Sequence, residues 1–294
     1  MWMWLAIASG YEVDPWTPRL VQLNDSAQVA SAVFDSMLDD AIDRLPDRCP
    51  ANDEVLRRKL GRAIAKVTAK RMVLAERRSF AAFGHGRYSG WLERDPLIAK
   101  VSTGHEGIFG DVGLGRSAVL RMAGTASTVR FGDVLLGTDK VDHFLATGFD
   151  YMRWSHWTED PDRALKRGTR TEKRFYGRWT SKAFSWADLE ANWDGYRFYA
   201  GLLDEGSVLQ RDPADCVRRV AHFDWTTWVD PAWDEFVNPT VYTDRVTEAI
   251  EERVAPDRER ICREWRPIDR EIPHEGKAPE AAGPFGIEGF CDGS

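Results

Sequence analysis

A dense group of ionisable side chains lies near the middle of the chain, where Asp139, Lys140, Asp142 and His143 fall in one run. Asp139 and His143 are four positions apart, so on a helix their side chains can meet one turn apart. A carboxylate beside an imidazole can orient the histidine for general base catalysis, or both can be ligands of a metal ion. The same contact can also do no more than satisfy a buried helix terminus, with Lys140 paired to a nearby acid. The sequence leaves these hypotheses open.

A metal ion held by Asp139 and His143 would need at least one further ligand from another part of the chain. The region from residue 82 to residue 130 is rich in glycine and polar residues, and it contains His85 and His105. Loops of this kind commonly carry functional residues. The predicted ligands of a divalent metal are therefore His143, Asp139 and His105, with His85 as the alternative to His105.

A second pair of carboxylates points to a different chemistry. Glu172 precedes a glycine-containing turn, and Asp188 lies at the start of a predicted helix. This arrangement resembles that of lysozyme-like glycosidases, in which a carboxylic acid protonates the glycosidic oxygen and a second carboxylate or a bound water completes the displacement. The resemblance implies Glu172 as the acid and Asp188 as its partner, whereas a metal-dependent hydrolase would use a metal held by His143. The tryptophans that would stack on sugar rings are Trp179, Trp186 and Trp193.

The residues after Gly137 have the pattern of a helix that starts at the charged group. A short apolar run, residues 134–136, ends at Gly137, and Thr138 or Asp139 is then placed to cap the first turn. Asp139 with Asp142 approximates a capping box, and both carboxylates suit the positive end of the helix dipole. Apolar residues then recur at three- and four-residue spacing, which predicts one face in the core.

Helix-start signals recur along the rest of the chain. They predict helices over about residues 26–45, 52–80, 185–203 and 243–254, each opened by a residue that can cap it. The first two are expected to form an antiparallel hairpin. Short strands are expected only around residues 129–136. The predicted fold is therefore mainly α: a single irregular multi-helix domain with few short strands and long aromatic-rich loops.

Composition limits the class of protein and its partners. Hydrophobic residues make up 43% of the chain and charged residues 30%, which is ordinary for a globular protein. The net charge of −7 argues against nucleic acid as the main partner, because phosphate binding needs a basic surface. The 13 tryptophans suit a core as well as a sugar- or partner-binding surface. Those in the irregular segment 204–239 are expected to pack over the helical core as a wrapping arm, with a carbohydrate-binding rim as the alternative.

The helix predicted over residues 52–80 carries a basic outer face between residues 57 and 71. This face could contact anionic lipid headgroups or another acidic partner. The alternative is a solvated face that balances an acidic protein.

The cysteines do not have the spacing of a zinc motif; they are Cys49, Cys216, Cys262 and Cys291. Their even number would permit two disulfides in an oxidising compartment, and Cys216 with Cys262 is the first pair predicted. The alternative is a set of free thiols in a cytoplasm.

The two ends of the chain differ from the middle in composition. Residues 1–9 are apolar but too short to span a bilayer, and they lack a basic start. They are interpreted either as the remnant of a signal peptide or as a segment buried in the core. The helical domain is expected to cover residues 10–265, and residues 266–294, rich in Pro, Gly and Glu, are expected to form a loosely held tail.

The run from Asp139 to Phe144, DKVDHF, resembles the Asp-Lys-x-x-His-Phe helix start of a group of uncharacterised bacterial envelope lipoproteins. A similar pattern occurs in the VanZ-like membrane proteins. The resemblance covers this run alone, and it implies a setting in the periplasm or cell envelope rather than an activity. We therefore expect an envelope-associated protein with a structural or binding role, whose partner is an envelope protein or cell-wall glycan. A hydrolase acting on that glycan is the alternative function, and a cytoplasm is the alternative location.

Overall fold

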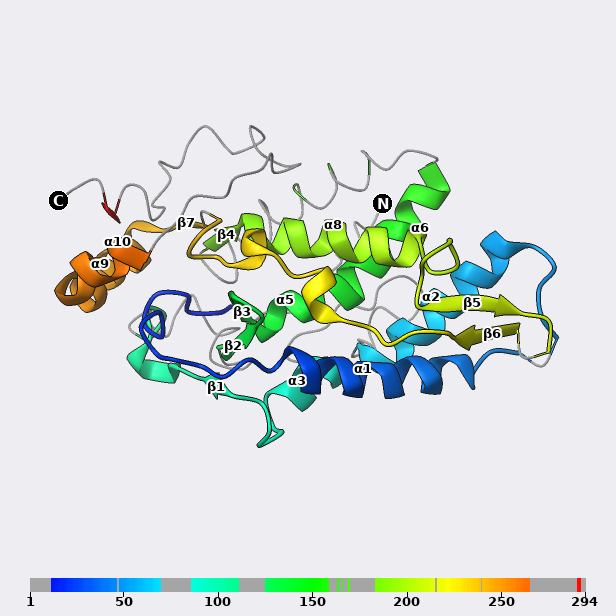
Figure 1. The fold of residues 1–294 in the computed structure, drawn as a ribbon. Coiled ribbons are helices and arrows are strands. Elements are labelled where there is room, and N and C mark those ends of the chain that lie inside the picture. Colours follow the sequence, from blue (N-terminus) through cyan, green and yellow to red (C-terminus); the bar gives the residue numbers. More distant parts are fainter. Residues whose placement is uncertain are drawn as a thin grey trace.

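The computed structural model describes residues 12–46, 48–69, 86–110, 125–158, 163, 166, 169, 183–214, 216–238, 240–264 and 290–291. Helices dominate these residues, and the strands are short and grouped in small antiparallel sheets (Figure 1). The predicted mainly α fold with few short strands is confirmed. Among the described helices, none is both long and apolar enough to cross a membrane.

Helices α1 (Ala27–Ile42) and α2 (Asp53–Thr68) pack against each other, as the predicted hairpin requires (Figure 1). Asn52 caps α2, because its side-chain oxygen accepts hydrogen bonds from two backbone N–H groups of the first turn. The helix predicted to reach about residue 80 ends earlier, since Ala69 adopts an extended conformation; residues 70–85 lie outside the described part. The buried side chains of the pair include Phe34, Leu38, Leu56, Leu60 and Ile64.

A small antiparallel sheet leads into the central helix. Its strands are β1 (Lys100–Val101), β2 (Thr128–Phe131) and β3 (Val134–Gly137). β2 pairs with both of the others, and the turn from β2 to β3 contains Gly132, whose φ of 58° favours glycine. The short helices α3 (Arg87–Leu92) and η2 (Gly104–Glu106) precede β2. The strands predicted around residues 129–136 are confirmed. The expectation that strands occur only there is wrong, because further short strands lie at residues 100–101, 183–185, 209–212, 216–219 and 240–242.

The central helix begins where β3 ends and contains a π-helical turn. Its parts are α5 (Thr138–Asp142), the π turn η3 (His143–Thr147) and α6 (Gly148–Thr158). The predicted capping is wrong, because Gly137 occupies the N-cap position and no side chain caps the helix there. Thr138 instead donates its hydroxyl to Glu93 Oε1 at 2.5 Å. A π turn within an α-helix often marks a functional position.

Helix α8 (Trp186–Ala200) packs along α6 and η3 (Figure 1). Ser185 caps it by accepting a hydrogen bond from the N–H of Asp188, which confirms the predicted helix start. Two glycines allow the helices to approach closely: a Cβ placed on Gly148 would lie 2.5 Å from the Cα of Gly195. The residues just before α8 form β4 (Ala183–Ser185), which pairs with β7 (Thr240–Tyr242).

The segment between α8 and β7 is largely irregular, as predicted. It contains β5 (Leu209–Asp212), β6 (Cys216–Arg219), η5 (Trp225–Thr227) and η6 (Pro231–Trp233). Trp225 and Trp233 are fully buried among core residues. For these two side chains the interpretation as a packing arm is confirmed.

The C-terminal elements form a second apolar cluster. They are α9 (Asp244–Val254), η7 (Ala255–Asp257) and α10 (Arg258–Glu264). A disulfide joins Cys262 to Cys291, so the predicted Cys216–Cys262 pair is wrong. Phe290 is buried with its ring 5.1 Å from that of Trp16, which anchors residues 290–291 of the predicted loose tail.

Candidate functional site

The side chain of Lys140 is fully buried and lies between three carboxylates from different parts of the chain. Its Nζ is 2.6 Å from Asp139 Oδ2, 2.6 Å from Asp188 Oδ1 and 2.5 Å from Glu235 Oε1. Burial alone would lower the pKa of Lys140, but these acids outweigh it and hold the pKa well above its ordinary value. Lys140 is therefore a charged ammonium that orders three carboxylates.

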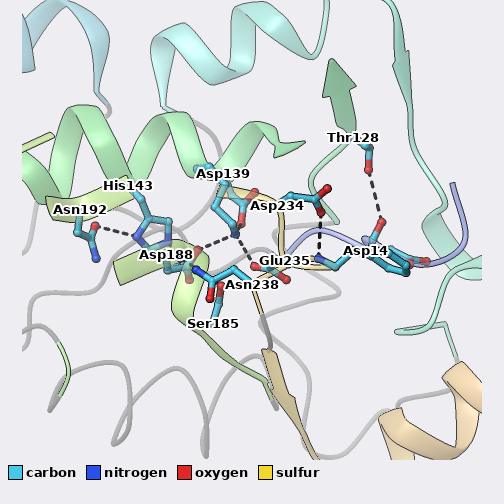
Figure 2. A network of polar contacts seen from close by, with 12 residues as sticks. Asp14, Thr128, Asp139, His143, Ser185, Asp188, Asn192, Asp234, Glu235 and Asn238 are labelled. Atoms are coloured by element: carbon cyan, nitrogen blue, oxygen red, sulfur yellow. Dashed lines mark hydrogen bonds and ion pairs between the residues drawn. The ribbon is translucent and has the colours of Figure 1, made fainter. Parts of the chain in front are cut away.

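His143 lies one turn along the central helix and connects the same cluster to α8 (Figure 2). Its Nδ1 is 3.0 Å from Asn192 Oδ1, and its Nε2 is 3.2 Å from Asp188 Oδ2. Asp188 and Asn192 are four residues apart on α8, so both face the imidazole. With the Asn192 carbonyl oxygen turned to Nδ1, that nitrogen donates the hydrogen bond. Nε2 and the Asp188 oxygen then need a shared proton or a cation between them, since neither lone pair can donate.

Glu12 adds a fourth carboxylate from the segment before the first helix. It is 3% exposed, and burial followed by the charges of Asp188 and Glu235 raises its pKa well above the ordinary value. Burial likewise raises the pKa of Asp139, and it raises that of Glu235 to about 7 despite the opposing effect of Lys140. Burial is the largest cause in each case, so the cluster lies in a region screened from water, where its carboxylates outnumber the ammonium of Lys140.

Some oxygens of these carboxylates have no hydrogen-bond partner within the described part of the chain: Glu12 Oε2, Asp139 Oδ1 and Glu235 Oε2. Two sets of side chains place their ligand atoms within 4.8 Å of one another: Asp139, His143 and Asp188, and separately Glu12, Asp188 and Glu235. These buried acidic and imidazole groups could hold a metal ion. Unsatisfied buried oxygens are costly, and a cation would satisfy them.

The structure brings together Asp139 and His143, which were predicted as metal ligands, and Asp188, which was predicted as one of a pair of catalytic carboxylates. His105 lies in η2, but its side chain lies outside the described part, as do Glu172 and His85. Asp142 points elsewhere: its Oδ2 accepts hydrogen bonds from the Gly86 N–H at 2.8 Å and the Ser89 hydroxyl at 2.6 Å.

Glu12 and Glu235 were not among the predicted site residues, although each is buried in the cluster. Glu235 follows a run of alternating acidic and tryptophan residues, which predicted only a packing arm or a carbohydrate-binding rim. Glu12 lies in an extended segment without periodicity, so no pattern marks it as buried. Both residues reach the site through tertiary packing alone.

No protein-family model, curated protein or solved structure matches this chain. The function of the protein is therefore inferred from the chemistry of its site.

Proposed function

We propose that this protein is an envelope-associated bacterial protein with a binding role, in which Asp139, His143 and Asp188 hold a divalent cation such as Zn²⁺ or Mn²⁺. The observation that carries the proposal is the buried set of ligand atoms within 4.8 Å of one another. A His with two carboxylates is a ligand set used for such ions.

The contacts of His143 support a ligand role for its Nε2. A metal-bound histidine commonly donates its other ring N–H to a carbonyl or carboxylate, which fixes the orientation of the ring. Asn192 Oδ1 provides that acceptor at 3.0 Å from Nδ1. Nε2 is thereby directed at Asp188, where a cation would relieve the conflict between two acceptors.

Lys140 supports the site by ordering its carboxylates. The ammonium contacts one oxygen of Asp139 and one of Asp188, so the other oxygen of each is not engaged by the lysine. This division explains how a lysine and a metal ion can use the same two side chains.

The envelope setting is supported by the resemblance of the DKVDHF run and by the Cys262–Cys291 disulfide. Disulfides form and persist mainly in oxidising compartments outside the cytoplasm. Peripheral contact with anionic lipid headgroups belongs to the same proposal, supported by the exposed basic residues Lys59, Arg62 and Lys66 on α2.

A metal-dependent hydrolase of cell-wall glycan is the second candidate, favoured by the number of protein ligands. Three protein ligands leave a coordination position that a water molecule can fill, as in catalytic metal sites. A binding role has the stronger support, because Asp139, His143 and Asp188 are each at most 3% exposed. The carboxylate-pair mechanism has less support, since Asp188 is already engaged by Lys140 and His143.

Metal analysis of the purified protein tests the proposal. After incubation with Zn²⁺ or Mn²⁺ and removal of excess ion, we expect bound metal in the wild type and the loss of one equivalent in His143→Ala. His156→Ala is the matched control, because His156 lies on the same helix but is exposed. The absence of bound metal in the wild type would refute the proposal. Metal-dependent cleavage of purified cell-wall glycan would favour the hydrolase over the binding role.

A further inference from the structure

We propose that Glu12, Asp188 and Glu235 form a second cation site, so that the cluster takes two divalent cations and Asp188 is shared between them. This inference rests on the proposed function and extends it. The ligands come from three segments: residues 12–26 before α1, called here the lead-in segment, the first turn of α8 and the turn after η6.

The burial of these three carboxylates and the missing partners of their oxygens indicate a second cation. Glu12, Asp188 and Glu235 are 3%, 2% and 3% exposed, and their ligand atoms lie within 4.8 Å of one another. Glu12 Oε2 and Glu235 Oε2 have no hydrogen-bond partner among the described residues. Buried carboxylates this close together repel one another unless a positive charge or a proton lies between them.

Lys140 does not provide the positive charge that these oxygens lack. Its ammonium contacts Glu235 through Oε1, the oxygen opposite the one without a partner. In the described part of the chain its ammonium forms ion pairs with Asp139, Asp188 and Glu235, and Glu12 receives no direct ion pair from it. The lysine thus orders Glu235 and leaves a second, separate place for a cation beside Glu12.

An ion also needs a route to the second site. A small hollow of about 10 Å³ opens beside Glu235, between the lead-in segment at Val13 and Arg19 and the end of β3 at Gly137. This is about the space of one water molecule, which suits a single ion and excludes a sugar ring. Of the three proposed ligands, Glu235 is the one that lines this hollow.

The donor atoms indicate which ion would bind. Glu12, Asp188 and Glu235 offer only carboxylate oxygens, which suit hard ions such as Mn²⁺, Mg²⁺ or Ca²⁺. The first site adds an imidazole, which Mn²⁺ also accepts. Mn²⁺ is therefore the ion expected to fill both sites. Two ions that share a carboxylate in this way lie about 4 Å apart in known two-metal centres.

Titration of the purified full chain with Mn²⁺ tests the inference, with bound metal measured after removal of the excess and electron paramagnetic resonance as a second readout. We expect two equivalents in the wild type, one in Glu12→Gln and one in His143→Ala. The wild type should show spin coupling between the ions, and each variant should show the pattern of an isolated ion. Glu248→Gln, an exposed residue on α9, is the control and should match the wild type.

The outcomes separate this inference from the proposed function. One equivalent in the wild type that survives Glu12→Gln but disappears in His143→Ala would overturn the second site and leave the proposed function standing; a shared proton would then link Glu12 to Glu235. No bound Mn²⁺ or Zn²⁺ in the wild type would overturn both. Two equivalents unchanged by Glu12→Gln would place the second ion elsewhere and also overturn the inference. If Glu12→Gln fails to fold by circular dichroism, Glu235→Gln takes its place and should lose the same equivalent.

Discussion

Lys140 illustrates how one residue sets the properties of the site. Its ammonium contacts one oxygen of each of three carboxylates at 2.5–2.6 Å and has no exposure to solvent. A buried charge is tolerated only when it is paired, and the acids around it would repel one another without it. At this scale Lys140 determines both the orientation of the ligands and the stability of the interior.

Replacing Lys140 by methionine keeps much of its volume but removes the positive charge. We expect Lys140→Met to lower the free energy of unfolding by about 3–5 kcal/mol, because it leaves buried carboxylates without their partner. Denaturant unfolding of the metal-free protein measures this change. Lys59→Met, at an exposed position of α2, is the control and should change stability by less than about 0.5 kcal/mol. Equal stability of the two variants would show that the acids are neutralised without Lys140.

At the scale of elements, the site depends on how closely α8 approaches the central helix. Asp188 and Asn192 reach His143 because Gly148 and Gly195 let the two backbones meet. A Cβ on Gly195 would press on the backbone oxygen of Phe144, in the π turn that also carries His143. Backbone atoms cannot move aside as a flexible side chain can, so this contact fixes the spacing of the ligands.

Gly195→Ala tests that spacing. Alanine normally stabilises a helix relative to glycine by about 1 kcal/mol, but overpacking against a backbone costs about 1–3 kcal/mol. We expect a net loss of stability in thermal unfolding and weaker metal binding, since α8 must move away from His143. Gly201→Ala, at the end of the same helix, has its nearest neighbour at 3.3 Å and should retain metal binding. Unchanged metal affinity in Gly195→Ala would show that the glycine contact does not position the ligands.

On the scale of the whole molecule, most of the apolar side chains of the described residues fall into two large clusters. The larger one contains α1, α2 and much of the central helix and α8, while the second gathers Trp16, Phe236, Ile250 and Phe290 around the C-terminal helices. The Cys262–Cys291 disulfide closes a loop of 29 residues onto the second cluster. Because Trp16 belongs to the same segment as Glu12, the contact of Phe290 with Trp16 joins residues 290–291 to the segment that carries Glu12.

The disulfide should contribute to stability at this scale. We expect the Cys262→Ser/Cys291→Ser double variant to be destabilised by about 3 kcal/mol, since a cross-link of this length restricts the unfolded chain. Thermal unfolding of the wild type with and without reductant should show the same loss. Cys49→Ser, a change at a free and partly exposed cysteine, is the control and should respond little. An identical melting temperature for oxidised and reduced wild type would contradict this prediction.

Local sequence determined the elements and part of the site. Capping residues such as Asn52 and Ser185 and the apolar spacing after Gly137 predicted where helices start, because these signals act over one or two turns. The four-residue spacing of Asp139 and His143 predicted that they share a helix face, and the structure places both in one candidate ligand set.

Only the tertiary structure decided which distant residues complete the site. Asp188 was predicted as one of a pair of catalytic carboxylates, and no local pattern marked Glu12 or Glu235. Packing nevertheless buries all three around Lys140. The Cys262–Cys291 pairing also depended on how the chain end returns to α10. Periodicity and capping report on neighbours along the chain, whereas the partners of a buried charge are set by which segments meet in space.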